Sequence, residues 1–265
     1  MCGINGIIFK KNDVDISKIK MMNSMLHHRG PDKSGFLKHK NILLGHTRLS
    51  IIDLTKNGYQ PMSNNGRHWI IYNGEIYNYK EIKKELINKN YKFYSETDTE
   101  VILTAFIEWG AKCFEKFNGE WSLAILDTVN NDLIISRDGI GYKPCYIYED
   151  DKYFAFSSEL KSFYSINSSL EIDKANFGIA SESLFYSSKT IFKNIEHLTQ
   201  GRFIKYNINS NKKTITRWDF PLNNLPKISV NYKENVENYF SLLHEATKIR
   251  LNSDVKIGTS LSGGL

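Results

Sequence analysis

The sequence lacks any apolar run long enough to cross a membrane. A spanning helix needs about 18 or more consecutive apolar residues, and no stretch of the 265 residues approaches that length. The start of the chain also lacks the basic and then apolar pattern of a signal peptide. We therefore expect a cytoplasmic protein without a membrane partner.

Cysteine is scarce as well. The three cysteines, Cys2, Cys113 and Cys145, are an odd number and do not have the paired spacing of zinc ligands. A disulfide framework is therefore excluded as the basis of the fold, and no metal site is predicted. We expect Cys113 and Cys145 to be inert core residues.

A concentrated basic segment is also missing. The net charge is +6, but the basic residues are scattered and no basic block is interleaved with aromatic residues. We expect a solvated surface and no nucleic-acid partner. Because 41% of the residues are hydrophobic, the chain can bury a substantial core.

The first residues of the chain carry the most informative pattern. If Met1 is removed, Cys2 becomes the N-terminal residue and its thiol lies beside a free α-amino group, which titrates at about 8 and can accept the thiol proton. The apolar residues of 4–9 predict a buried strand behind it. A frayed start with an incidental cysteine is the alternative for a motif taken alone.

Helices and strands are predicted in separate parts of the chain. Helical spacing of apolar residues predicts helices over 16–26 and 79–87, and a third over 97–110 with a capping box formed by Thr97 and Glu100. The polar stretch 29–35 is predicted to be a loop. Strands are predicted over 121–127, 133–137, 146–148, 153–157, 202–206 and 214–218. Helices followed by such a meander predict an α+β fold in layers.

Polar residues in apolar surroundings mark candidate binding positions. Arg48 lies in an apolar run over 42–53, where its charge calls for an anionic partner, either a ligand carboxylate or an internal acid. Asn73-Gly74 is a strong hairpin signal, but an Asn amide and a Gly N–H can also form an oxyanion hole. Glu75 adds a carboxylate for a cation. Asp98 is favoured by the dipole of its helix, and a substrate ammonium could also use it.

Several spaced motifs in one order resemble the glutamine-hydrolysing asparagine synthetases. The matching stretches are MCGI at 1–4, HRGPD at 28–32, RLSIID at 48–53, NGEIYN at 73–78, DTEVI at 98–102 and SSELK at 157–161. The resemblance implies a four-layer αββα sandwich of the N-terminal nucleophile hydrolase type. It places a glutaminase domain at 2–219, a linker at 220–231 and the start of an α/β ATP-pyrophosphatase domain at 232–265.

The same resemblance implies roles in binding and hydrolysing glutamine. Cys2 would attack the side-chain amide with its own amine as base, and Asn73 and Gly74 would hold the oxyanion. The α-carboxylate would be bound by Arg48, and the α-amino group by Glu75 and Asp98. The backbone of Leu49, Ser50, Ile51 and Ile52 would line the same pocket. This step needs no cofactor.

The end of the chain resembles part of a nucleotide site. A helical face around 236–243 is followed by a predicted buried strand over 255–261 and by small residues that can cradle phosphate. By resemblance, Leu261, Ser262, Gly263 and Gly264 belong to a loop that binds ATP, with Mg²⁺, in the full-length family. Because the loop is incomplete, ATP-dependent synthesis is not expected from this chain alone.

Several functions remain open at this point. The ammonia would serve to amidate aspartate, or another carboxylate such as a surface-polysaccharide sugar acid. An amidotransferase making amino sugars or the first purine intermediate would share Cys2 and Asn73-Gly74. An inactive truncated remnant is the non-enzymatic alternative. A homodimer is left open.

Overall fold

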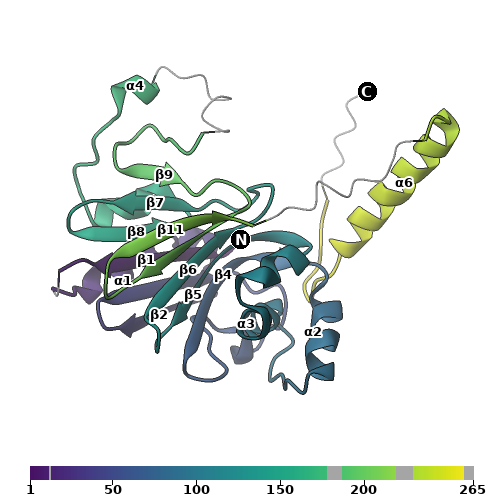
Figure 1. Cartoon of the computed structure of the whole chain (residues 1–265), viewed down its shortest axis with the longest axis horizontal. Helices are drawn as coiled ribbons and strands as arrows, with labels where there is room; N and C mark the ends of the chain where they lie inside the picture. Colours follow the sequence, from purple (N-terminus) through teal and green to yellow (C-terminus); the bar gives the residue numbers. More distant parts are fainter. Residues whose placement is uncertain (12, 178–186, 219–228, 260–265) are drawn as a thin grey trace.

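Two antiparallel β-sheets stacked face to face form the centre of the molecule (Figure 1). The computed structural model describes residues 1–11, 13–177, 187–218 and 229–259. The first sheet has the strand order β2-β3-β1-β8-β7-β9, and the second has the order β11-β10-β6-β5-β4. The strands of the first sheet are β1 (Gly3–Phe9), β2 (Lys33–His39), β3 (Ile42–Arg48), β7 (Tyr146–Glu149), β8 (Tyr153–Ser157) and β9 (Ile195–His197). Those of the second are β4 (His68–Ile76), β5 (Gly119–Asp127), β6 (Asp132–Arg137), β10 (Arg202–Asn207) and β11 (Lys212–Arg217).

The main core fills the space between the two sheets. Ile4 and Leu44 from the first sheet belong to the same buried cluster as Leu126 and Ile135 from the second. All seven residues of β1 are buried, which confirms the predicted strand behind the N-terminus. Because β1 pairs with β3 on one side and β8 on the other, the start of the chain is fixed at the end of a central strand.

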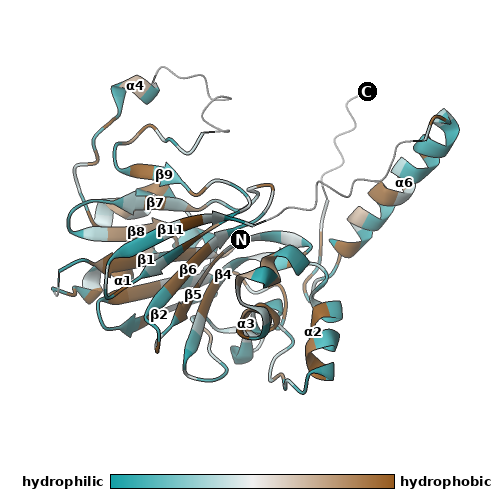
Figure 2. Ribbon diagram, viewed as in Figure 1, coloured by the Kyte–Doolittle hydropathy of each residue, from teal (hydrophilic) through white to brown (hydrophobic). Residues whose placement is uncertain are grey.

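Helices cover the outer faces of both sheets. α1 (Ile16–Met25) and the 3₁₀ helix η4 (Leu160–Ser165) pack on the first sheet, where Ile19 and Met22 join a second buried cluster. α2 (Tyr79–Asn88), α3 (Asp98–Trp109) and η3 (Gly110–Lys116) cover the second sheet. Brown apolar positions are frequent on the strands, on α3 and on one side of α2 (Figure 2), and buried residues of these elements belong to the clusters between helices and sheets. The expected four-layer αββα sandwich is confirmed. The short helices are η1 (His27–Arg29), η2 (Lys56–Gly58) and α4 (Lys174–Phe177).

The predicted capping box of α3 is only half formed. The Thr97 side chain accepts a hydrogen bond from the Glu100 N–H at 3.2 Å, as expected for an N-cap. The Glu100 carboxylate does not return to Thr97, however, because it accepts from the N–H groups of Tyr94 and Ser95 at 3.0 and 2.7 Å. The Glu100 carboxylate therefore stabilises the loop that precedes α3 and does not cap the N-terminus of the helix.

The interpretation of 29–35 as a loop was wrong at its end, because β2 begins at Lys33. The side chains of β2 alternate between exposed and half-buried positions, and the strand lies at the sheet edge. An edge strand needs few apolar residues, so its pattern is weak in the sequence.

The last part of the chain contains α6 (Tyr232–Ile249), which confirms the predicted helix near 236–243. It projects away from the sandwich, with its C-terminal end beside α2 (Figure 1). The strand predicted over 255–261 is absent from 255–259, where Val255 and Ile257 are 40% and 49% exposed, and no described strand pairs with this segment. Without a neighbouring strand, its backbone has no ladder partner. Residues 260 and 261 lie outside the described residues.

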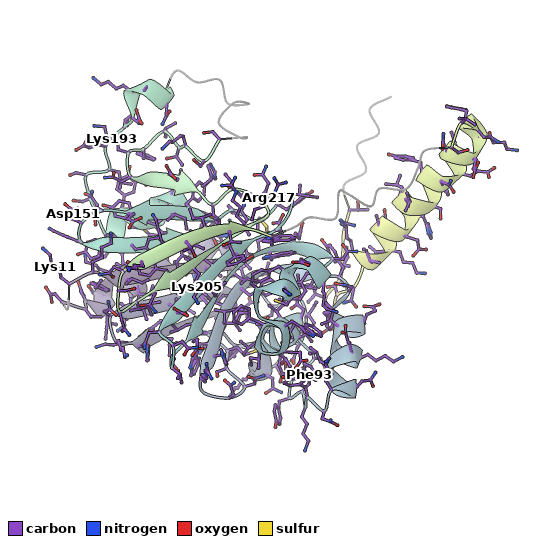
Figure 3. All side chains as sticks on the ribbon, viewed as in Figure 1. Lys11, Phe93, Asp151, Lys193, Lys205 and Arg217 are labelled. Atoms are coloured by element: carbon purple, nitrogen blue, oxygen red, sulfur yellow. The ribbon has the colours of Figure 1, made fainter. Side chains whose placement is uncertain are left out.

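The labelled basic side chains in Figure 3 come from different elements across the molecule. Lys11 follows β1, Lys193 precedes β9, Lys205 lies on β10 and Arg217 ends β11, and all four are exposed.

The described helices include none with the length and apolar character that a membrane span requires.

Candidate active site

A pocket of about 570 Å³, counting its open mouth, lies where the N-terminus meets β4 and the start of α3. Nine of the residues predicted to bind or hydrolyse glutamine line it: Cys2, Arg48, Leu49, Ile51, Ile52, Asn73, Gly74, Glu75 and Asp98. Ser50 is the exception, since it is not among the lining residues and its N–H binds the Asp32 carboxylate at 2.7 Å.

The backbone around Cys2 is held in place by residues far along the chain. The Leu49 N–H points to the Cys2 Sγ at 3.4 Å, and the Sγ lies 3.6 Å from the Leu49 carbonyl. The Arg29 Nε donates to the Cys2 carbonyl at 2.9 Å, and Glu159 binds Arg29 at 3.0 Å. The HRGPD and SSELK motifs therefore meet behind the N-terminus.

The thiol and the terminal amine have complementary proton affinities. Burial raises the pKa of the Cys2 thiol, which therefore stays protonated at neutral pH. Burial also lowers the pKa of the α-amino group of Met1, and the nearby Arg29 and Lys143 charges act in the same direction. A thiol that keeps its proton needs a base. This amine belongs to Met1, and the α-amino group of Cys2 becomes free only when Met1 is removed.

Asn73 and Gly74 lie inside β4 and do not form the predicted hairpin. They pair with Ser122 and Trp121 of β5 in an unbroken register from His68 to Ile76. The hairpin interpretation was wrong because the neighbouring strand comes from far along the chain. A Cβ on Gly74 would lie 2.1 Å from the Glu120 carbonyl oxygen, so the glycine serves close strand packing.

β4 is an edge strand, and alternate N–H groups point away from β5. On that open side the N–H of Ile70 donates to the Met62 carbonyl, that of Tyr72 to the Gln60 side chain, and that of Ile76 to the Asp98 carboxylate. The alternation directs the Gly74 N–H to the same side, where the pocket lies. The Asn73 Nδ2 is buried and has no hydrogen-bond partner among the described residues. Two donors are thus available in one pocket with the Cys2 thiol.

Arg48 ends β3 with its side chain buried. Its guanidinium donates to the carbonyls of Thr55 at 2.9 Å, Ile52 at 3.3 Å and Asp53. Among the described residues no acidic side chain accepts a hydrogen bond from Arg48, because the carbonyls of a tightly turned loop take that place. Gly58 leaves the necessary room, since a Cβ there would lie 2.0 Å from Nη2.

Glu75 and Asp98 make one side of the pocket acidic. Asp98 begins α3, and its carboxylate accepts from the Tyr72 hydroxyl at 2.8 Å and the Ile76 N–H at 3.1 Å. Burial raises the pKa of Asp98 to about 6 despite these bonds. Burial and the Asp98 charge raise the pKa of Glu75 as well. Two carboxylates with raised pKa values are suited to a cationic ligand group, which would restore their charged forms.

The family follows from comparison with known sequences. A model of the glutamine amidotransferase domain matches residues 1–219. The chain belongs to the glutamine amidotransferase family. It is 37% identical over its whole length to a putative glutamine-hydrolysing asparagine synthetase of Methanocaldococcus jannaschii, of which it covers 55%. It is 32% identical to asparagine synthetase 3 of Bacillus subtilis, again over the whole chain and 44% of that protein. The chain thus spans about half the length of these relatives.

A solved structure supports the amidotransferase fold. The glutamine phosphoribosylpyrophosphate amidotransferase of Bacillus subtilis superposes with a TM-score of 0.63 at 17% identity, covering 82% of this chain and 49% of that one. At this identity the likeness shows the fold alone. The predicted αββα sandwich is thereby confirmed as the architecture of this amidotransferase domain.

The structure adds lining residues that the sequence did not reveal. Gln60, Tyr72, Thr97, Thr99 and Lys143 also face the amidotransferase pocket. The position of Tyr72 could have been inferred from its neighbour Asn73, and that of Thr97 from its neighbour Asp98. Gln60 and Lys143 lie in loops distant in the sequence, and no local pattern there predicts a place in the pocket. Within the described ranges, no group of three His, Cys, Asp or Glu side chains could hold a metal ion. The predicted ATP residues Leu261, Ser262, Gly263 and Gly264 lie outside those ranges.

Proposed function

We propose that this chain hydrolyses the side-chain amide of glutamine, with Cys2 as the N-terminal nucleophile after loss of Met1. The observation that carries the proposal is the buried, unpartnered Asn73 Nδ2 in the same pocket as the Cys2 thiol and the open side of Gly74. A buried donor without an acceptor costs about 1–3 kcal/mol, which is recovered when a ligand oxygen binds it.

The proposed reaction begins with proton transfer from the thiol to the neutral α-amino group of Cys2. The Sγ then bonds to the amide carbon, and the carbonyl oxygen becomes an oxyanion that accepts from Asn73 Nδ2 and the Gly74 N–H. Collapse breaks the carbon–nitrogen bond, and the α-ammonium gives its proton to the departing NH2 group, which leaves as ammonia. Water, deprotonated by the same amine, then hydrolyses the thioester to glutamate and free thiol.

Recognition of glutamine rests on the charges at the two sides of the pocket. Arg48 would pair with the α-carboxylate, while Glu75 and Asp98 would bind the α-ammonium. Leu49, Ile51 and Ile52 would provide the surrounding wall. A zwitterion fits this division of charge better than a simple amide does, because each of its ends meets an opposite charge.

Release of glutamate and ammonia from glutamine by the purified chain tests the activity directly. Equal amounts of both products are expected, and little hydrolysis of an amide such as propionamide, which lacks the α-substituents. Absence of glutamine hydrolysis by a folded chain that has lost Met1 would favour the inactive remnant.

Arg48→Lys is expected to weaken glutamine binding by about 2 kcal/mol, or roughly 30-fold, because the three donors of a lysine ammonium cannot keep the loop carbonyls and also bind a carboxylate, whereas arginine has five. The measurement is calorimetric titration of glutamine into chains carrying Cys2→Ala. Arg29→Lys is the matched control, since Arg29 contacts the Cys2 backbone and not the proposed ligand. Unchanged affinity in Arg48→Lys would refute the assignment.

The pKa of Asp98 predicts a pH dependence of glutamine affinity. Below about pH 6 the carboxyl is protonated and loses its attraction for the ammonium, so binding in the Cys2→Ala background should be about tenfold weaker at pH 5 than at pH 7. Asp98→Asn, which keeps an oxygen for Tyr72 and Ile76, should bind weakly and show a flatter profile. A steep profile retained in Asp98→Asn would assign the dependence to Glu75 instead.

The wider reaction is proposed from the relatives. The ammonia would serve ATP-dependent amidation of aspartate in a cytoplasmic asparagine synthetase, with 2–219 as the glutaminase domain, 220–231 as linker and 232–265 opening the synthetase domain. ATP, with Mg²⁺, would bind there.

A further inference from the structure

The segment that follows α6 touches the rim of the glutamine pocket. The Arg250 guanidinium lies 4.7 Å from the centre of the Tyr77 ring, directly after β4. The Lys80 Nζ, on α2, donates to the Asn252 side chain at 3.0 Å. Residues 250–254 lie beyond the part of the chain that matches the amidotransferase domain.

Asp254 makes the most specific of these contacts. Its N–H donates to the Ile51 carbonyl at 3.0 Å, and its carboxylate accepts from the Asp53 N–H at 2.8 Å. The two bonds bracket Ile52. Both Ile51 and Ile52 line the pocket, so Asp254 holds the outer side of a segment whose inner side faces the proposed ligand.

The bracketed segment is strained and also holds Arg48. Asp53 has φ +53°, a left-handed conformation that a residue other than glycine adopts only when its surroundings hold it there. Its carbonyl, together with those of Ile52 and Thr55, accepts from the Arg48 guanidinium. Any change in the backbone at 52–53 therefore moves the acceptors that orient Arg48.

Asp53 connects the same segment to the acidic side of the pocket. Its carboxylate accepts from the Thr55 hydroxyl at 2.6 Å and from the Glu96 N–H at 3.1 Å, two residues before Asp98. The loop at 51–55 thus lies between the cationic and acidic sides of the proposed glutamine site.

We propose that Asp254 is a positioning residue for the glutamine pocket, which acts through the loop at 51–55 on Arg48. The inference rests on the proposed function. Its consequence is that affinity for glutamine depends on a contact supplied from outside the matched amidotransferase domain. Movement of the segment after α6 would therefore change glutamine binding without any contact to the ligand.

Asp254→Ala in the full chain tests this, because it removes the acceptor for the Asp53 N–H and keeps the backbone bond to Ile51. KM for glutamine should rise about five- to tenfold with kcat nearly unchanged, the effect of losing one hydrogen bond that orients the binding group. Amide hydrogen exchange at 49–55 should be faster. Asp254→Asn, which retains an oxygen acceptor, should restore both, and Glu237→Ala on the exposed face of α6 is the matched control.

The two measurements separate the ways in which the inference can fail. If the wild-type chain hydrolyses glutamine and Asp254→Ala leaves KM unchanged, the positioning role is wrong even where exchange becomes faster. Unchanged exchange at 49–55 would likewise overturn it. A wild-type chain that neither binds nor hydrolyses glutamine would overturn the proposed function, and the inference with it.

Discussion

Cys2→Ala is expected to lower glutamine hydrolysis by about 10³-fold or more, because the reaction then has no nucleophile. The polar contacts of the Sγ within the described structure are two long ones with Leu49, so the thermal unfolding temperature should change little. Release of glutamate from glutamine is the measurement. Cys113→Ala is the matched control for loss of a thiol, since that cysteine lies on η3 and is fully buried in the core. Hydrolysis that persisted in Cys2→Ala would remove Cys2 from the mechanism.

Retention of Met1 should have an effect of similar size. The base is an α-amino group that must belong to Cys2, and in the unprocessed chain the amine belongs to Met1, whose residue also lines the pocket. Preparing the chain while methionine removal is inhibited should yield a folded but nearly inactive protein, with the added mass of one methionine. Equal activity of the two preparations would show that the free amine of Cys2 is not the base.

The parts of the site that carry a local signal in the sequence were predictable. Cys2 before a buried strand, Arg48 at the end of an apolar run and Asp98 in the first turn of a capped helix each carry a local signal. These positions meet in one pocket because the start of β1, the end of β3 and the start of α3 lie at the same place. The helical spacing of apolar residues in the sequence also predicted α1, α2 and α3, which cover the sheets.

What depends on distant partners was not predictable. Asn73-Gly74 has the local pattern of a turn, yet β5 keeps it extended, and only the register with Trp121 explains the glycine. The carbonyls that hold Arg48 come from a loop whose shape depends partly on Asp254, about 200 residues away in the sequence. The predicted strand after Ser253 has apolar residues but no neighbour to pair with in the described structure. Local composition does not specify such contacts.

Asn73→Ala is expected to lower kcat by about 10²- to 10³-fold, the usual cost of losing one oxyanion donor. KM should change little, because the Nδ2 interacts more strongly with the developing oxyanion than with the neutral carbonyl of bound glutamine. Asn73→Asp should be at least as impaired, since it has almost the same shape but replaces the donor by a negative charge. Steady-state kinetics of glutamate release would measure both variants.

Strand β5, which pairs with β4, provides a control for the effect of altering a buried polar side chain in this sheet. Ser122 pairs directly with Asn73 across β4 and β5, is fully buried and does not line the pocket. Ser122→Ala should therefore leave kcat within about twofold of the wild-type value, because it removes no group that faces the reacting carbonyl. If Asn73→Ala raised KM and left kcat unchanged, the Asn73 amide would bind the ground state of glutamine. The oxyanion would then have to be stabilised by the Gly74 N–H and another donor.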